Sequence, residues 1–234
     1  MGDETIVITG GSRGIGRAVT VEFLGAGASV VVCARDVESL ESIADEIDGD
    51  SERADLTTIR ADVRDEFDVE RLMEQAARAG GGTIDLVIAN AGVNHGTPGE
   101  MPLGSESYSR FDDTIRTNLR GVFSTIREAI PHLDDDGRIL VPSGSVARDA
   151  KPGMGAYAAS KAGAEAIVRG FAVDIEQSVC VIDPGVVATD LTGTDRARDP
   201  EDVAPMFYWA GMEADAESID GEVVDLRTWK RSTR

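Results

Sequence analysis

The chain has 234 residues, and 41% of them are hydrophobic, which is enough for one large domain with a full core. Its 43 acidic and 23 basic residues leave a net charge of −20, which argues against nucleic acids and anionic membranes as main partners. No apolar run approaches the ~20 residues of a membrane-spanning helix, and no signal peptide is visible, so we expect a cytoplasmic protein.

Short, β-branched apolar segments alternate with amphipathic ones along the chain. The predicted strands are Thr5–Thr9, Ser29–Ala34, Thr57–Asp62, Ile84–Ala89, Arg138–Pro142, Val179–Asp183 and Glu222–Leu226. The predicted helices are Gly16–Leu24, Val37–Ile47, 65–79, Tyr108–Pro131, Tyr157–Ile175 and a segment that starts at Pro200. Strands that are apolar throughout and separated by helices indicate a parallel sheet covered on both faces. We therefore predict one α/β domain over residues 1–234, a doubly wound parallel sheet of about seven strands with the Rossmann fold.

The first strand-to-helix turn, Thr9–Gly16, is rich in glycine. Glycine lets the backbone turn tightly and approach a pyrophosphate, and the start of the next helix offers free N–H groups. The spacing here is G-x-x-x-G-x-G, which differs from the commonest dinucleotide fingerprint. We predict a cofactor phosphate site made of Gly10, Ser12, Arg13, Gly14, Ile15 and Gly16.

Tyr157 and Lys161 are four residues apart, which places them on one face of a helix. A neighbouring ammonium favours the phenolate, so we expect the pKa of Tyr157 to lie below its usual value of about 10. Such a pair is a candidate general acid–base. The same spacing also fits a surface tyrosine stacked on a lysine stem, so the pair alone does not decide the function.

Taken together, the motifs resemble the short-chain dehydrogenase/reductase family, and within it the 3-oxoacyl-acyl-carrier-protein reductases. The matching pieces, which appear in the family's order over nearly the whole chain, are Thr9–Gly16, Asp62-Val63, Asn90-Ala91-Gly92, Asn118, Tyr157 with Lys161, and Pro184-Gly185. The resemblance implies an oxidoreductase that acts on a small carbonyl or alcohol with a nicotinamide cofactor. It also implies a homodimer or homotetramer.

The resemblance assigns roles to residues beyond the glycine turn. It implies that Asp62 and Val63 lie at the adenine, that Lys161 binds the nicotinamide ribose, and that Asn118 holds a water that relays protons to that lysine. It places the following residues beside the cofactor: Asn90, Ala91, Gly92, Pro184, Gly185, Val187 and Thr189. His95, in the loop after the fourth strand, is a candidate substrate contact.

The sequence departs from the family at the catalytic serine, because Gly144 occupies the position thirteen residues before Tyr157. Aligning Ser145 with the family's Ser-Val-Ala favours that serine, and Ser143 is the second candidate. The departure supports a rival function, an NAD(P)-binding regulator or sensor without catalysis. Retention of Tyr157, Lys161 and Asn118 favours the enzyme. A nucleotide-sugar epimerase ranks lowest, because only 45 residues follow Thr189.

The end of the second strand bears on the choice of cofactor. Ala34 stands where NAD-binding members carry an acid, and Arg35 follows it. Guanidinium groups suit phosphate, so Arg35 and Arg13 predict NADP(H) through its 2′-phosphate. NAD(H) is the alternative, because Asp36 comes next. We predict no metal site, since two scattered histidines and two cysteines in apolar runs, Cys33 and Cys180, make no ligand set.

The surface charge predicts a dependence on salt. Only Lys151, Lys161 and Lys230 are lysines among 23 basic residues, and an acidic, lysine-poor chain is typical of halophiles, here of a haloarchaeal source. Salt screens the self-repulsion of such a charge. We expect the free energy of unfolding to rise with salt concentration in denaturation experiments. Full stability at millimolar ionic strength would contradict this expectation.

Overall fold

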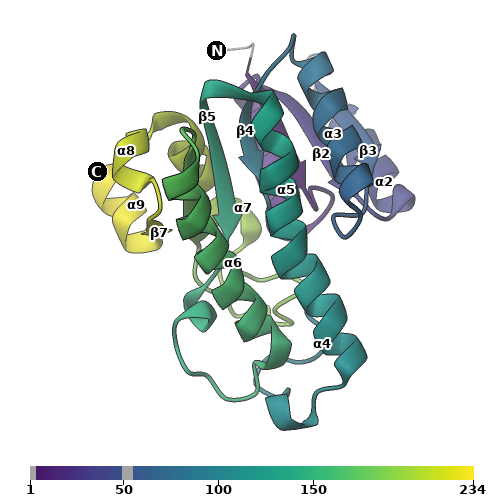
Figure 1. The fold of residues 1–234 in the computed structure, drawn as a ribbon, viewed down its shortest axis with the longest axis vertical. Helices are drawn as coiled ribbons and strands as arrows, with labels where there is room; N and C mark the ends of the chain where they lie inside the picture. The colour runs from purple at the N-terminus through teal and green to yellow at the C-terminus, as the bar shows by residue number, and fades with distance from the viewer. Residues whose placement is uncertain (1–3, 49–54) are drawn as a thin grey trace.

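Seven parallel strands form one sheet in the computed structural model, which describes residues 4–48 and 55–234. The predicted domain 1–234 also includes residues 1–3 and 49–54, which lie outside the described residues. The strands are β1 (Thr5–Thr9), β2 (Ser29–Ala34), β3 (Leu56–Arg60), β4 (Ile84–Ile88), β5 (Leu133–Pro142), β6 (Ser178–Asp183) and β7 (Val223–Asp225). Their spatial order is β3-β2-β1-β4-β5-β6-β7 (Figure 1).

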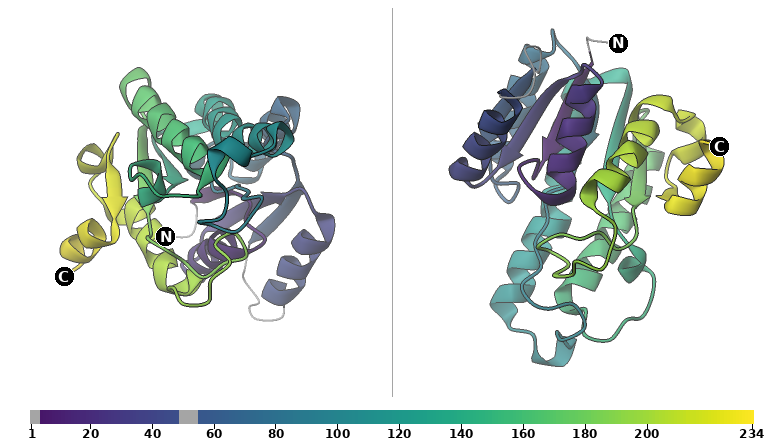
Figure 2. Two further views of the ribbon diagram at one scale, coloured as in Figure 1. Left: turned by 90° about the horizontal axis from the view of Figure 1, so that it is seen from below. Right: turned by 180° about the vertical axis from the view of Figure 1, so that it is seen from behind.

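Helices cover both faces of this sheet, which confirms the predicted doubly wound α/β fold (Figures 1 and 2). One face carries α3 (Glu66–Ala79), α5 (Gly121–Ala129) and α6 (Gly155–Asp174). The other face carries α1 (Gly14–Gly25), α2 (Val37–Asp48) and α7 (Pro200–Tyr208). The shorter helices are α4 (Tyr108–Ile115), α8 (Ala216–Ile219) and α9 (Leu226–Ser232).

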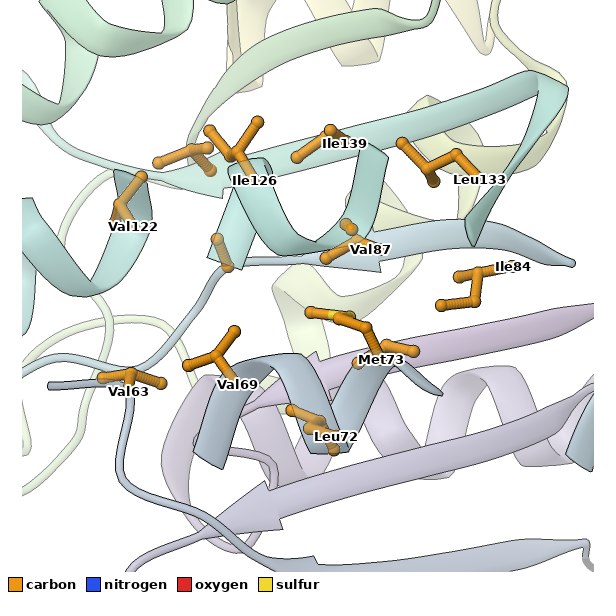
Figure 3. Close-up of a cluster of buried hydrophobic side chains, with 14 of the residues drawn as sticks. Val63, Val69, Leu72, Met73, Ile84, Val87, Val122, Ile126, Leu133 and Ile139 are labelled. Atoms are coloured by element: carbon orange, nitrogen blue, oxygen red, sulfur yellow. The ribbon is translucent and has the colours of Figure 1, made fainter. Parts of the chain in front are cut away.

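Each face of the sheet has its own hydrophobic core, because successive residues of a strand point to opposite sides. In β1, Val7 packs into the core beneath α3 and α5, whereas Ile6 and Ile8 pack into the core beneath α1 and α7. Figure 3 shows part of the first core, where Leu72 and Ile126 come from the two helices. The apolar strands thus serve both cores and hold the sheet rigid below the site.

Three predicted strands end earlier than expected, the fourth by one residue, at Ile88 instead of Ala89. The third was predicted to include Asp62, but it ends at Arg60, and Asp62 instead accepts a hydrogen bond from the Arg64 backbone N–H within a turn. The last was predicted to reach Leu226, but that residue opens α9, because Asp225 accepts from the Thr228 N–H and caps the helix.

The long helix predicted over Tyr108–Pro131 is interrupted. A π-helical turn, Arg116–Arg120, separates α4 from α5 and contains Asn118. Such turns are frequent at functional sites, because they redirect one side chain out of the helical register. The interruption therefore sets where the Asn118 amide points.

The two cysteines are buried and free, as predicted. Among the helices of residues 4–48 and 55–234, none is long and apolar enough to cross a membrane.

Candidate active site

A cavity of about 540 Å³ opens at the carboxyl ends of the strands. It lies where the strand order reverses between β1 and β4, which is the usual ligand position in an open parallel sheet. Nearly all of the predicted site residues line it; the exceptions are Asp62, Asn118 and Ser145.

The glycine turn lines one side of the cavity, together with Ser12, Arg13 and Ile15. A Cβ atom at Gly16 would lie 2.2 Å from the Gly10 carbonyl oxygen, so only glycine fits there. Gly10 itself has a φ of +67°. The helix that follows, α1, has no acidic residue in its first turn and no side-chain cap. Its N-terminal N–H groups and positive dipole end therefore suit a pyrophosphate.

Asn90 holds the ends of β1 and β4 together at this point. Its Nδ2 donates to the carbonyl oxygens of Thr9 and Gly10, both at 3.0 Å. The Ala91 N–H donates to the Thr9 hydroxyl at 3.1 Å. These bonds keep the floor of the cavity fixed next to the glycine turn, and Gly92 continues it.

One end of the cavity is lined by the residues predicted to determine the preference for NADP(H) or NAD(H). Arg13 and Arg35 are both exposed and line it, together with Val63. Asp36 also lines this end, but its carboxylate accepts hydrogen bonds from the Ser39 hydroxyl and N–H. Those bonds lower the pKa of Asp36, and they hold its carboxylate against the first turn of α2.

Asp62 does not line the cavity. Burial opposes its ionisation, but bonds from Arg64, the shortest at 2.6 Å, hold the pKa of Asp62 below its usual range. Arg64 also contacts Asp113, which lies 2.7 Å from Nε2 of His95. His95 lines the cavity, and Asp113 fixes its ring. Arg64 and Asp113 were not predicted, because nothing in the sequence links them to His95.

Tyr157 and Lys161 both line the cavity from α6, so the structure brings the predicted pair together. Lys161 is only 7% exposed, and its Nζ donates to the Pro142 carbonyl oxygen at 2.8 Å. The same Nζ lies 5.8 Å from the centre of the Tyr157 ring. The ammonium is therefore held between the end of β5 and the phenol.

Burial dominates the titration of this pair. It raises the pKa of Tyr157 to about 12. It lowers the pKa of Lys161 to about 8, although the Glu165 carboxylate opposes that shift. The expected lowering of the Tyr157 pKa is therefore wrong for the structure, because desolvation of the phenolate outweighs the effect of the lysine. At neutral pH the phenol holds a proton that it can donate.

The two candidate serines lie in different surroundings. Ser143 lines the cavity next to Pro142, and its hydroxyl donates to Oε1 of Glu165 at 2.7 Å. Ser145 is in a single 3₁₀ turn, Ser145–Ala147, and its hydroxyl accepts a hydrogen bond from Lys151. The second candidate, Ser143, is therefore the serine that faces the cavity. The alignment with the family's Ser-Val-Ala had favoured the other.

Asn118 is buried behind the cavity wall, at 1% exposure. Its amide accepts from the Val93 N–H at 2.8 Å and donates to the Val93 carbonyl at 2.9 Å. Its Nδ2 also donates to Ser160 at 3.0 Å. The side chain thus anchors the loop that follows Gly92, and the proton relay stays a prediction.

The turn after β6 also lines the cavity, and its Thr189 lies against Gly14 of the glycine turn. The residues of this turn that line it are Pro184, Gly185, Val187 and Thr189. Oδ1 of Asp183 accepts from the Gly185 N–H at 3.0 Å and fixes the turn. The buried carboxylates of Asp183 and Glu165 both pair with Arg148, which is partly exposed, and these ion pairs were not predicted. The available signal was Glu165, an acid one helical turn after Lys161.

The family model described as short chain dehydrogenase matches residues 4–200. The chain belongs to the short-chain dehydrogenase family. It is therefore an oxidoreductase on a nicotinamide-dinucleotide fold, and the glycine turn, the cavity beside it and the uncapped start of α1 fit such a cofactor.

Named relatives of this short-chain dehydrogenase include the versicolorin reductase of Emericella nidulans, at 36% identity over 94% of this chain and 92% of the relative. A short chain dehydrogenase of Burkholderia cenocepacia in complex with NADP has a TM-score of 0.83 at 26% identity, with 96% of each chain covered. A 3-ketoacyl-(acyl-carrier-protein) reductase of Brucella melitensis complexed with NADH has a TM-score of 0.85 at 25% identity, over 96% of this chain and 97% of that one. The 3-oxoacyl subclass and the haloarchaeal source stay predictions.

The titration of Lys161 predicts the pH dependence of this dehydrogenase. Because the pKa of Lys161 is lowered to about 8 while that of Tyr157 is raised to about 12, the ammonium is lost first as pH rises. We expect kcat/KM of the oxidoreductase to fall above a pH of about 8, since this parameter reports groups of the free enzyme. Circular dichroism over the same range serves as the control for unfolding. A rate that stays flat up to pH of about 10 would contradict the assignment.

Proposed function

We propose that the chain is a single-domain, NADP(H)-dependent oxidoreductase that interconverts a carbonyl and an alcohol. The observation that carries the proposal is the convergence of Tyr157, Lys161 and Ser143 on the cavity that the glycine turn also lines. A protonated phenol and a buried ammonium next to a phosphate cradle are suited to reduction at a carbonyl.

In the proposed mechanism, Gly10–Gly16 and the start of α1 would hold the pyrophosphate of the cofactor, and Val63 would lie at its adenine. A nicotinamide cofactor, when bound, would supply the hydride that reduction of a carbonyl requires. Tyr157 donates its proton to the carbonyl oxygen and takes it back in the oxidation direction. Lys161 binds the ribose, and its positive charge stabilises the phenolate that proton transfer leaves. The turn at Gly185 positions the carboxamide.

The preference for NADP(H) is supported by two exposed cations at one end of the cavity, Arg13 and Arg35. Asp36, which would favour the ribose hydroxyl of NAD(H), already accepts hydrogen bonds from Ser39 at one of its two carboxylate oxygens. NAD(H) is the alternative cofactor. The NADP and NADH complexes of the two structural neighbours are compatible with either choice.

A second candidate is a binding protein without catalysis, a regulator or sensor. Gly144 at the family's serine position motivates it. Ser143 weighs against it, because this serine lines the same cavity as Tyr157.

We further propose a cytoplasmic homodimer or homotetramer that packs through α5 and α6. The pair Phe123 and Phe171 joins these two helices, with ring centres 5.9 Å apart, and Phe123 is 39% exposed. An aromatic side chain that is exposed on a pair of helices is suited to pack against a second copy of the chain. The haloarchaeal origin is proposed with it, on the net charge of −20.

Replacing Tyr157 with Phe tests the reaction. The variant removes only the hydroxyl, so we expect it to bind NADPH within about twofold of the native chain while kcat falls about a hundredfold or more. NADPH oxidation is measured in high salt with tetralone, an acetoacetyl thioester and a keto sugar. A native chain that binds NADPH but reduces no carbonyl would favour the sensor.

Replacing Arg35 with Ala tests the cofactor preference. We expect the Kd for NADPH to rise about tenfold, because a charged hydrogen bond to the 2′-phosphate is lost, while the Kd for NADH stays unchanged. Arg71→Ala, on the exposed side of α3, is the matched control. An equal loss of affinity for both cofactors would contradict the role of Arg35.

A further inference from the structure

A row of hydrogen-bonded side chains ends at the cavity in His95. Arg64, in the turn after β3, donates to Asp62 through Nη2 at 2.6 Å and to Oδ1 of Asp113 through Nη1. The other oxygen of Asp113, Oδ2, lies 2.7 Å from Nε2 of His95. His95 lines the same cavity as Tyr157. Three segments that are distant in the sequence, namely the turn after β3, α4 and the loop after β4, thus meet at this imidazole.

The loop that carries the imidazole is anchored as well. The Asn118 amide bonds both backbone groups of Val93. The side chain of Asn94, the next residue, donates to the Leu191 carbonyl oxygen at 3.4 Å. His95 follows directly. Its ring is therefore attached to a fixed backbone and is also held at its tip.

The bond to Asp113 determines which nitrogen of His95 carries a proton. Burial opposes the ionisation of Asp113, but the hydrogen bonds from His95 and Arg64 hold the pKa of this carboxyl below its usual range. A carboxylate only accepts hydrogen bonds, so Nε2 of His95 must donate. Within residues 4–48 and 55–234, no hydrogen bond joins the second nitrogen, Nδ1, to another group. Nδ1 accepts a hydrogen bond when the ring is neutral and donates one when the ring is an imidazolium.

These ion pairs contribute little to stability. The side chains of Arg64, Asp113 and His95 are 30%, 29% and 34% exposed, and solvent screens ion pairs at that exposure. What the row of bonds fixes is the position of the imidazole and the nitrogen that it leaves free.

We propose that His95 binds a hydroxyl group of the substrate that is separate from the reacting carbonyl, and that Asp113 positions His95 for this contact. The inference rests on the proposed oxidoreductase function. A hydroxyl can both donate and accept, so it suits Nδ1 in either protonation state of the ring, whereas a carboxylate suits only the imidazolium. The substrates are then carbonyl compounds that carry a further hydroxyl. Tyr157 acts on the reacting carbonyl, and the second hydroxyl keeps its proton.

The first test compares tetralone with ring-hydroxylated tetralones, each of which differs from it by one added phenol. His95→Gln keeps an amide N–H for Asp113 but has no counterpart of Nδ1. For the hydroxytetralone that the native chain prefers, we expect this variant to lower kcat/KM about three- to tenfold more than for tetralone, the size of one hydrogen bond. The intrinsic reactivity of each ketone cancels when the native chain and the variant are compared.

The other histidine of the chain, His132, provides the matched control, because His132→Gln should leave the preference unchanged. An equal loss for both ketones in His95→Gln would overturn the inference. So would a rise in the Kd for NADPH as large as the loss of preference, because the ring would then serve the cofactor.

The second test asks whether Asp113 acts through His95. We expect Asp113→Ala to remove the preference for the hydroxytetralone, and Asp113→Asn, which keeps an acceptor oxygen for Nε2, to retain most of it. Asp112→Ala, at the exposed neighbouring position on α4, is the matched control. In the His95→Gln background, Asp113→Ala should change the preference less than about twofold. A further loss as large as in the native background would contradict the positioning role.

Nitrogen NMR of the chain labelled at histidine needs no turnover, and only His95 and His132 contribute signals. In the complex with NADP⁺, on the alkaline side of the ring's titration, we expect His95 to carry its proton on Nε2. Adding the hydroxytetralone should shift the Nδ1 signal more than adding tetralone. A proton on Nδ1 instead, or no shift of Nδ1, would overturn the inference. If Nδ1 shifts but the native chain reduces no ketone, the proposed function fails while the hydroxyl contact of His95 is upheld.

Discussion

The hydrogen bond from the buried Lys161 ammonium to the Pro142 carbonyl organises the site. A buried cation must be paired, so this bond holds α6 against the end of β5. Tyr157, one turn earlier on α6, is thereby carried to the cavity wall, and Ser143 follows Pro142 on the same wall. This contact therefore joins the helix that carries Tyr157 to the strand end that carries Ser143.

Desolvation then sets the protonation of these groups. Burial raises the pKa of Tyr157 to about 12 and lowers that of Lys161 to about 8, so the phenol is an acid in the free protein and the ammonium is close to titrating. Glu165 opposes the second shift and also accepts a hydrogen bond from the Ser143 hydroxyl. A single buried carboxylate thus interacts with both Lys161 and Ser143.

The sequence was sufficient for the fold and for most of the cavity wall, because strand periodicity and the glycine turn are local signals. Asn90, from the motif after the fourth strand, lines the cavity as well. The expectations that the structure does not bear out depend on the tertiary surroundings of the residues. The pKa of Tyr157 follows from burial that spacing does not reveal, and the choice between Ser143 and Ser145 depends on how the chain leaves β5. The partners of Arg148 come from distant segments, so no local pattern identifies them.

The central claim is that Tyr157 and the hydride-bearing nicotinamide ring act on the same carbonyl group in this cavity. The ring acts on the carbon, and Tyr157 acts on the oxygen. The most direct measurement uses NADPH that carries deuterium at the transferable position of the nicotinamide, with tetralone as the acceptor. The account predicts an alcohol with deuterium on its carbinol carbon and a hydroxyl proton taken from solvent. Bound NADPH that is never oxidised, or an alcohol without the label, would contradict it.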